Sequence, residues 1–509
     1  MDELIKLELR NLDKLPDKVS RPKYDRSELS PGIVHIGVGN FHRAHQAWYL
    51  HRLMQQGQAR DWGIIGAGVR APYDGKMREN LLQQDCLTTL IELDPAGVSA
   101  EVIGSMIDYL PVEKGNSSLI EAMADPAIRI VSLTVTEGGY FLDPVTGEFD
   151  AKNEEVLFDA NNPDRPNTAF GAILAALKIR KQRGEKPFTV LSCDNLMSNG
   201  DVTRQTVASL ARLSDPALAD WVNATCHFPN SMVDCIVPAT GEQELSLVRE
   251  LGIADEAPVT HENFRQWVME DSFGAGRPQW EQVGVTFTNA VHNYEAMKLR
   301  ILNAGHQIVA NAGEILSLET IADCMSNKSI SAMFNKVQLD EIAPQVCPVP
   351  GMEPAQYVRL IEDRFGNEAI VDTTRRVAFD GSSRHAGFVL PIIMERIESG
   401  SSVQGLALVE AMWARMCEGT RQDGSLIEPN DPQWEDLNSV AKQARRNPAA
   451  WLEQQQYYGE LGRVPEFADA FDHWLNLIWN EGLEAALKSY IASDLRSASK
   501  ADGQPALQE

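Results

Sequence analysis

The sequence has few cysteines, and their spacing argues against two common uses of thiols. Its 509 residues include seven cysteines, and no two of them are separated by two residues. Disulfide frameworks and structural zinc sites need an even or closely spaced set. The sequence therefore predicts free, buried thiols in a reducing cytoplasm. The seven are Cys86, Cys193, Cys226, Cys235, Cys324, Cys347 and Cys417.

Long apolar runs and an excess of positive charge are also missing. No run of about 18 uninterrupted apolar residues occurs, so no membrane span is expected. The first six residues lack the basic and then apolar regions of a signal peptide. Lys and Arg number 46 against 72 Asp and Glu, a net charge of −26. Nucleic acid and anionic membrane are therefore not expected as partners, because both need basic patches.

Metal-binding motifs are scarce. The ten histidines include no H-E-x-x-H, and His42 and His45, three residues apart, have no cysteine or well-spaced carboxylate nearby. We predict no metal, so the chemistry must come from side chains and an organic cofactor. An anionic cofactor is compatible with the acidic composition, since backbone N–H groups can hold it.

A glycine turn follows the first strand candidate. The run Ile33–Ile36 is followed by Gly37 and Gly39 and then by helical spacing, the context of a dinucleotide-binding fingerprint. His42 stands where the third glycine is usual, so a glycine-rich connection with no ligand remains the alternative. The predicted cofactor contacts here are Gly37, Val38, Gly39, Asn40 and Phe41.

The second strand candidate, 63–69, bears on the choice of cofactor. An acidic residue near the end of this strand often binds the ribose hydroxyls. Arg70 alone would favour a 2′-phosphate, whereas Asp74 would repel one. The two signals conflict, and we take Asp74 as the cofactor contact and NAD as the cofactor.

Three more strand candidates, 86–93, 128–135 and 188–192, alternate with helical segments. This alternation predicts an α/β domain with a mostly parallel sheet. Ligands bind such sheets beyond the carboxyl ends of the strands, where Thr136, Glu137 and Asn195 lie. Thr136 and Glu137 are predicted cofactor contacts. Asn195 lies where it could also meet a cofactor, with an ordinary turn former as the alternative.

Helical periodicity dominates from about residue 290. The predicted helices cover 313–334, 355–366, 402–418, 447–460 and 466–492. We therefore expect a dinucleotide-binding domain over 1–290 and an all-α domain over 291–509.

One predicted helix carries three polar candidates. Met297, Ile301, Ala304 and Ile308 recur at three- and four-residue intervals and stripe one side of it. At about 100° per residue, Lys298, Asn303 and His306 fall at about 100°, 240° and 180° from Met297. A lysine, an amide and an imidazole on one face can transfer protons and polarise a carbonyl, and a solvated helix face is the alternative.

Two arginines, Arg376 and Arg384, flank a predicted turn, Asp380–Ser383. Arginines around a turn are usually solvated. Their other use is to grip hydroxyl or carboxylate oxygens of a substrate.

Taken together, these residues resemble the mannitol dehydrogenase family of long-chain, zinc-independent polyol dehydrogenases. The most specific pattern is K-x4-N-x2-H from Lys298 to His306. The resemblance runs from about residue 30 to about 490. Its densest stretches are Gly32–Leu53, Ser132–Tyr140, Ser192–Asn195, Phe228–Asp234, Phe264–Asp271 and Lys298–His306.

The resemblance implies a Rossmann-type domain, an α-helical domain and an active site between them. By likeness to the family, Lys298 is the general base, and Asn195 and Asn303 stabilise the developing alkoxide. The resemblance further implies that the polyol hydroxyls are held and oriented by His306, Asp234, Arg376 and Arg384.

Four departures from the family pattern fall near the implied site. Cys235 stands where an arginine is usual, and Gly305 where a serine is common. Arg384 replaces a common lysine, and His385–Gly387 follows where a proline-containing segment is usual. The last two put the choice of substrate in doubt, not the reaction type.

The leading hypothesis is an NAD-dependent polyol 2-dehydrogenase that converts mannitol to fructose. Arabinitol dehydrogenase, fructuronate reductase and tagaturonate reductase are the alternatives within the family, and a dinucleotide-binding sensor without turnover is the alternative outside it. The expected partners are a small polyol or ketose. The sequence leaves the oligomeric state open, and a monomer is compatible with it.

Overall fold

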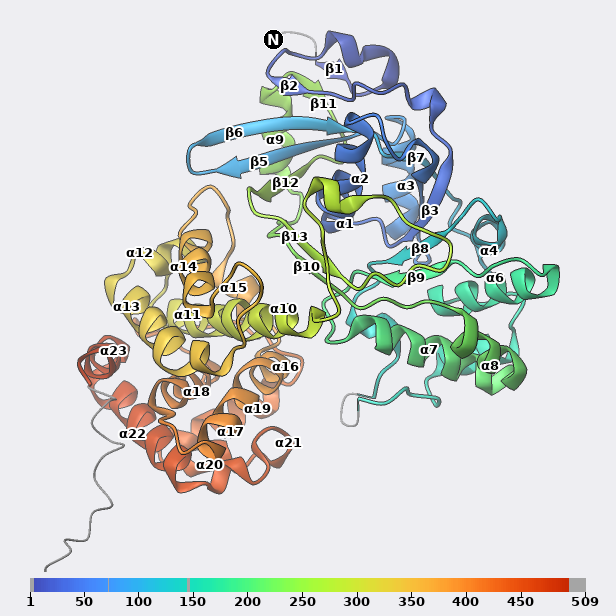
Figure 1. The fold of residues 1–509 in the computed structure, drawn as a ribbon. Helices are drawn as coiled ribbons and strands as arrows, with labels where there is room; N and C mark the ends of the chain where they lie inside the picture. Colours follow the sequence, from blue (N-terminus) through green and yellow to red (C-terminus); the bar gives the residue numbers. More distant parts are fainter. Residues whose placement is uncertain (1–3, 72, 144–146, 494–509) are drawn as a thin grey trace, which may run out of the picture. The chain divides into compact units, whose positions relative to one another are not determined.

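A computed structural model describes residues 4–71, 73–143 and 147–493 of the chain (Figure 1). The chain divides into two compact units, residues 1–292 and 293–509. Each unit has its own secondary structure and core, and each is described separately.

The first unit is built on a five-stranded parallel sheet with the order β7-β4-β3-β8-β9. Its strands are short and rich in Val, Ile and Leu, as expected of strands covered on both faces. The α/β prediction is confirmed. The strands are β3 (Pro31–Ile36), β4 (Gly63–Ala67), β7 (Met106–Tyr109), β8 (Ile130–Leu133) and β9 (Thr189–Ser192).

Two groups of helices cover this sheet, each with its own hydrophobic core. One core joins the sheet to α4 (Ser117–Ala124), α6 (Ala169–Arg183) and α7 (Asn199–Ser214). The other joins it to α1 (Asn40–Ala44) and α2 (Gln46–Gln55). Figure 1 shows α1 and α2 beside β3, and α6 and α7 on the side of β9.

The predicted strand 86–93 does not belong to the parallel sheet. It forms β5 (Thr88–Asp94), which pairs antiparallel with β6 (Gly97–Ile103) in a separate sheet ordered β12-β5-β6-β2. A tight turn joins the two strands: the Ala96 N–H donates to Asp94 Oδ1 at 2.7 Å, and Gly97 has φ 147°. Two-residue turns connect antiparallel neighbours, so β5 pairs with β6 and not with the five-stranded sheet, while its other edge pairs in parallel with β12. The flanking strands are β2 (Val19–Ser20) and β12 (Val259–Glu262).

The second unit is helical, as predicted, but several predicted helices are interrupted. The span 313–334 contains the end of α11 (Ala304–Ile315), α12 (Ile321–Ser326) and the start of α13 (Lys328–Val337). The breaks come from Ser317, which has φ 61°, and from Thr320, whose hydroxyl caps α12 by accepting from the Asp323 N–H. The span 447–460 contains only two single turns, α20 (Ala449–Leu452) and α21 (Gln455–Tyr458).

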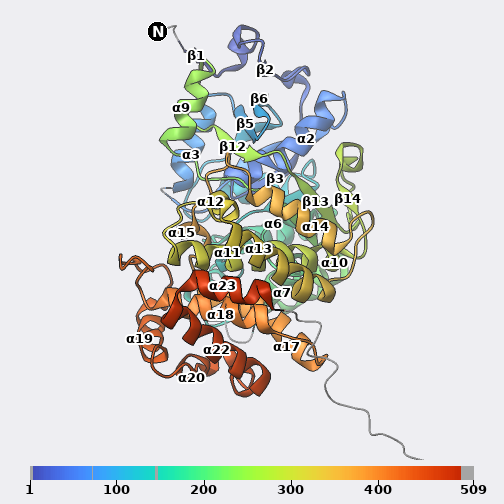
Figure 2. The same cartoon turned by 90° about the vertical axis from the view of Figure 1, so that its left-hand side faces the viewer.

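A glycine divides the last predicted helix. Gly482, with φ 89°, separates α22 (Pro465–Glu481) from α23 (Leu483–Ala492). A left-handed residue ends an α-helix, and glycine adopts it most easily. The helix α22 packs against both α23 and α18 (Gln404–Cys417), and the three helices lie together in Figure 2.

Within residues 293–493 of this unit, three helical segments are π-helices. They cover Lys298–Asn303 (η6), Gln338–Ile342 (η7) and His385–Val389 (η9). The π-helix is rare, usually a single turn within an α-helix, and frequent at functional sites. Two of the three include or directly follow residues singled out in the sequence, Lys298 and Arg384.

The seven thiols are free, and five of them are buried. Cys226 is partly exposed and Cys347 exposed, so the prediction of uniformly buried thiols is wrong at these two positions. Every helix in the described ranges is too short or too polar to cross a bilayer.

Candidate functional site

The glycine turn after β3 is a tight connection that only glycine permits. Gly37 has φ 97°, and a Cβ added there would overlap the backbone carbonyl oxygen of Thr134. A side chain is thus excluded both by the backbone conformation and by the neighbouring strand. Gly39 follows at the N-terminal boundary of α1, and a Cβ there would meet nothing closer than 4.0 Å.

A cavity of about 300 Å³ lies at the carboxyl ends of β3, β4 and β8. It brings together five residues predicted as cofactor contacts, namely Gly37, Val38, Gly39, Asp74 and Thr136. Its far wall was not predicted, because it comes from a distant part of the chain, residues 155–169. Those residues are Glu155, Asn167, Thr168 and Ala169.

Three other predicted contacts do not line this cavity. The Asn40 amide instead donates to the Pro238 carbonyl at 3.0 Å and to Thr240 Oγ1 at 2.9 Å. Phe41 stacks on the His45 ring with centroids 4.9 Å apart, and Glu137 is exposed. The Asn40 side chain is therefore engaged in holding a loop of its own unit.

Asp74 faces the turn that follows β4. It lies in the first turn of α3 (Tyr73–Leu82), and its Oδ2 accepts from the Arg70 N–H at 2.7 Å. A Cβ added to Gly68 would overlap the Asp74 carboxylate, so this glycine permits the close approach. Asp74 is half-buried at the cavity wall, where it adds negative charge.

His42, in the place of the usual third glycine, fills the space between helix and sheet. Its ring stacks on His35 with centroids 3.4 Å apart and planes 12° apart. His35 in turn bridges Ser132 Oγ at 2.8 Å and Thr134 Oγ1 at 2.9 Å. Burial lowers the pKa of His35 to about 3 and that of His42 well below its usual value, so both rings are neutral. Two stacked imidazoles therefore provide the helix–sheet contact that a glycine usually permits.

Asp194 was missed in the sequence, although it lies in the stretch Ser192–Asn195. Its buried carboxylate accepts from the Val135 N–H at 3.1 Å, the Thr136 N–H at 2.8 Å and the Tyr140 hydroxyl at 2.6 Å. Burial raises the pKa of Asp194 to about 6, although these three hydrogen bonds oppose the change. Asp194 thus anchors the loop that lines the cavity. The signal was a carboxylate directly after a buried strand.

Asn195 and Asp234 end neighbouring segments of the same unit. Asn195 is exposed just after β9, and Asp234 is the buried last residue of β10 (Ser231–Asp234). Ser231 Oγ donates to the Ser192 carbonyl at 2.6 Å and ties the two segments together.

In the helical unit, Lys298, Asn303 and His306 are half-buried rather than solvated. The first two bound the π-helix η6, and His306 lies in the first turn of α11. The His306 ring stacks on Phe365 with centroids 4.4 Å apart. The apolar stripe opposite is buried, as predicted, at Met297, Ile301, Ala304 and Ile308.

Two residues of η6 are bound by side chains from other segments. The Arg300 guanidinium makes two 2.6 Å hydrogen bonds to the Glu395 carboxylate. The Gln338 amide donates to the Ile301 carbonyl at 2.8 Å, which satisfies a backbone group inside the segment. A Cβ on Gly305 would lie 2.8 Å from Gln338 Nε2, so the glycine in place of the family's serine makes room for this amide.

Arg376 and Arg384 line a second cavity, of about 330 Å³, together with Arg375, Phe379, Pro429 and Asn430. Arg376 is exposed and paired with Asp372 at 2.7 Å. Arg384 is half-buried, and its Nη1 donates to the Val377 carbonyl at 2.5 Å. The predicted turn between them is one helical turn, α16 (Gly381–Arg384), which follows directly after Asp380 at φ 57°. Lys298, Asn303 and His306 are not among the residues that line this cavity.

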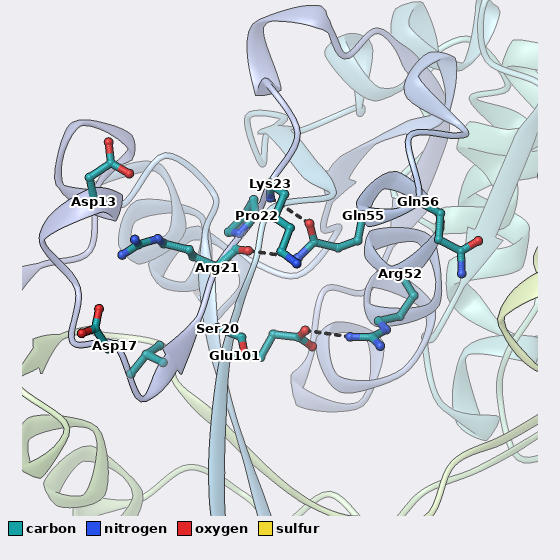
Figure 3. Close-up of a pocket in the computed structure, with 11 residues that line it drawn as sticks. Asp13, Asp17, Ser20, Arg21, Pro22, Lys23, Arg52, Gln55, Gln56 and Glu101 are labelled. Atoms are coloured by element: carbon teal, nitrogen blue, oxygen red, sulfur yellow. Dashed lines mark hydrogen bonds and ion pairs between the residues drawn. The ribbon is translucent and has the colours of Figure 1, made fainter.

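A cleft of about 650 Å³ near the N-terminus contains none of the predicted residues (Figure 3). Its lining charges balance, with three acids and three bases, and Arg52 pairs with Glu101 at 3.1 Å. The Gln55 side chain accepts from the Lys23 N–H and donates to the Arg21 carbonyl. Several of its polar groups therefore bind each other.

No group of three or more His, Cys, Asp or Glu side chains in the described part of the chain is arranged to hold a metal ion. The candidate site residues fall into two sets. The first unit contains the glycine-lined cavity, and the second carries a lysine, an amide, an imidazole and two arginines.

Comparison with known proteins gives matches along nearly the whole chain. The model of the mannitol dehydrogenase Rossmann domain matches residues 31–282, and that of the mannitol dehydrogenase C-terminal domain matches residues 290–479. Mannitol 2-dehydrogenase of Cereibacter sphaeroides is 52% identical over 475 residues, which are 93% of this chain and 99% of that protein.

Two solved structures are similar over their full length. One is Pseudomonas fluorescens mannitol 2-dehydrogenase in ternary complex with NAD and D-mannitol, with 39% identity, a TM-score of 0.86 and coverage of 96% of this chain and 99% of that one. The other is a D-sorbitol dehydrogenase in substrate-free form, with 34% identity, a TM-score of 0.86 and coverage of 94% and 100%.

Proposed function

Because the chain belongs to the mannitol dehydrogenase family, we propose that it oxidises D-mannitol at C2 to D-fructose with NAD. The structural observation that carries the proposal is the half-buried set Lys298, Asn303 and His306 on one helical segment. A proton acceptor and an alkoxide donor held on a rigid element suit oxidation of an alcohol without a metal.

Lys298 is the general base. Its Nζ takes the proton of the C2 hydroxyl as the C–H bond breaks. The half-buried Lys298 side chain must be in its neutral form to accept this proton.

Asn195 and Asn303 stabilise the alkoxide that develops as this proton leaves. Each side-chain amide can donate a hydrogen bond to the oxygen, which is the role that zinc has in other alcohol dehydrogenases. His306, Asp234, Arg376 and Arg384 bind and orient the remaining hydroxyls. Stacking on Phe365 fixes the plane of the His306 ring, so its hydrogen bond to a hydroxyl has a defined direction.

The residues of the first unit fit NAD. Gly37 and Gly39 leave the backbone bare at the cavity, so the pyrophosphate can approach it closely. Asp74, which also lines the cavity, suits the ribose hydroxyls. When bound, NAD accepts the hydride from C2 of the polyol.

A change of Asp74 tests the cofactor assignment. Asp74→Ala should improve kcat/KM with NADP about tenfold, because a carboxylate near the ribose repels a 2′-phosphate. Arg70→Ala is the matched control and should change the use of NAD little. The measurement is steady-state kinetics with both cofactors. A wild-type protein that already prefers NADP would show that Asp74 does not face the ribose.

A change of Asp194 tests the loop that lines the cavity. Asp194→Asn replaces one acceptor by a donor that faces the Val135 and Thr136 N–H groups or the Tyr140 hydroxyl. An unsatisfied buried polar group costs about 1–3 kcal/mol, so the Kd of NAD at pH 7 should rise about tenfold. Fluorescence titration with NADH measures this, and the Arg70→Ala protein again serves as the control.

The pH dependence has a defined direction. Because the pKa of Asp194 is about 6 in the folded chain against 3.8 in an unperturbed Asp, the carboxyl is protonated in the fold below about pH 6. NAD binding by the wild type should therefore weaken as the pH falls through 6, and Asp194→Asn should not show this step. The contribution of Asp194 to the free energy of unfolding falls as the pH rises from about 4 to about 6. NAD affinity that is flat from pH 5 to 7 in the wild type would contradict this role.

Steady-state rates on a panel of substrates test the whole function. Mannitol, arabinitol and sorbitol are compared in oxidation, and fructose, fructuronate and tagaturonate in reduction. Mannitol and fructose should have the highest kcat/KM. A clear preference for a uronate would refute the polyol assignment, and the absence of NAD reduction by every polyol would favour the sensor. We also propose a cytoplasmic location, which the free thiols support.

A further inference from the structure

A row of buried polar side chains passes beside Arg384 in the helical unit. It consists of Asn311, His385, Glu410 and Tyr458. Its centre is His385, the residue after Arg384 and the first of the π-helix η9. His385 Nδ1 lies 2.7 Å from Glu410 Oε1, and both side chains are fully buried. His385 Nε2 lies 2.9 Å from Asn311 Nδ2. The mechanism above uses none of these three residues.

The hydrogen bonds assign one tautomer to His385. The Asn311 amide nitrogen also donates to the Gln307 carbonyl at 3.1 Å, so it is oriented as a donor toward His385 as well. His385 Nε2 must then accept, and Nδ1–H donates to Glu410. A fixed tautomer fixes the plane of the ring.

The opposite end of the row is equally well held. Glu410 Oε2 accepts from the Tyr458 hydroxyl at 2.6 Å, and the Tyr458 hydroxyl oxygen in turn accepts from Trp451 Nε1 at 2.7 Å. The Trp413 ring stacks on His385 with centroids 4.4 Å apart and planes 11° apart. His385 therefore has a partner at each ring nitrogen and a partner on its face.

The same contacts hold the segment that carries Arg384. A Cβ on Gly381 would lie 2.7 Å from Trp413 Nε1, so the helical turn α16 rests directly on that ring. Ser382 donates to the Asp431 carboxylate through its N–H at 2.7 Å and its hydroxyl at 2.8 Å. The backbone on both sides of Arg384 is thus anchored to buried groups.

The row also meets the Arg384 side chain from α11. Gln307, one helical turn before Asn311, donates from Nε2 to the Val377 carbonyl at 3.3 Å. The same carbonyl accepts from Arg384 Nη1 at 2.5 Å. Through Gln307 and Asn311, α11 thus contacts the Arg384 segment at Val377 and at His385. The same helix carries His306.

We propose that His385, held between Glu410 and Asn311, is a positioning residue that fixes Arg384 and so determines which polyol the enzyme prefers. The inference rests on the proposed function of Arg384 as a group that binds substrate hydroxyls. Hexitols such as mannitol and sorbitol differ only in configuration at one carbon. That carbon is C2, the one that is oxidised, so a guanidinium that fixes the remaining hydroxyls also fixes which configuration at C2 turns its hydroxyl toward Lys298, whereas a guanidinium that can shift accommodates both.

The test is a double-mutant cycle on Arg384→Ala and His385→Ala. Each single change should raise the KM for mannitol about tenfold, with the KM for NAD within about twofold. Once Arg384 is removed, His385→Ala should raise the KM less than about twofold further, because it acts through Arg384. His385→Ala should also lower the ratio of kcat/KM for mannitol to that for sorbitol about tenfold.

Leu487→Ala is the matched control for lost stability. Leu487 is a fully buried residue of α23, has no polar side-chain atom and takes no part in the row. It should lower the melting temperature without changing the KM for mannitol or the mannitol-to-sorbitol ratio. If His385→Ala does not fold, the cycle is run with His385→Asn, whose amide still donates to Glu410 but does not reach Asn311; its expected rise in KM is smaller.

The outcomes separate the two proposals. No effect of Arg384→Ala on any polyol KM would refute the role of Arg384 in the proposed function. An effect of Arg384→Ala with none of His385→Ala would refute only the positioning role. Additive effects in the double variant, or the same change in Leu487→Ala, would show that His385 is merely structural.

Discussion

Replacing Lys298 by alanine is expected to lower the turnover of mannitol by about 10²- to 10⁴-fold, the contribution of a positioned general base. NAD binding should survive, because the glycine-lined cavity belongs to the other unit. A small external amine should restore part of the activity, since the lost group is a proton acceptor. The measurement is steady-state turnover over a range of pH, with and without the amine.

The control for this experiment is Lys488→Ala. Lys488 lies on α23, is largely exposed and pairs with Glu484 at 3.4 Å, so its loss should leave turnover unchanged. An ionisation in the pH profile of the wild type should disappear in Lys298→Ala and persist in the control. A folded Lys298→Ala protein that binds NAD and turns over mannitol at the wild-type rate would end this mechanism.

Asn303→Ala should lower turnover by about 10²- to 10³-fold, as expected for the loss of one donor to a developing oxyanion. External amines should not restore this activity, because the missing group is a hydrogen-bond donor. The pH profile should keep the ionisation lost in Lys298→Ala. Asn335→Ala is the matched control, since this α13 amide donates instead to Glu362 at 2.6 Å. Equal rescue of both active-site variants by an amine would show that Asn303 has another role.

The local patterns of the sequence predicted the elements that carry the site. A β-branched strand, a glycine turn and helical spacing indicated the β3–α1 connection, and the structure shows that a side chain at Gly37 is excluded. The buried apolar stripe through Ile301 and Ile308 was also predicted, because core faces repeat with the helix period.

The form of the helix at Lys298 could not be predicted in the same way. A regular α-helix was assumed, and the segment Lys298–Asn303 is π-helical. Within this segment the Ile301 carbonyl accepts a hydrogen bond from the Gln338 amide, 37 residues away. No pattern within the helix itself records such a contact.

Asp194 and His385 were hidden for a related reason. Each is a polar residue whose partners come from distant segments, Val135 and Thr136 for the first and Asn311 and Glu410 for the second. A single sequence shows residue types but not which buried donor meets which acceptor. Burial then sets their chemistry, and burial is a property of the fold.

The π-helix at Lys298–Asn303 has a consequence for how related chains are compared and redesigned. Its hydrogen bonds span five residues instead of four, so the segment holds one residue more than an α-helical turn would. It is the form that a one-residue insertion takes when the helix beyond it keeps its direction. A deletion within this segment would restore an α-helix and keep His306 in phase with the residues before the segment, but it would shorten the spacing from Lys298 to Asn303 by one residue. A gap of one position here is therefore a functional change, although it would look neutral in an alignment.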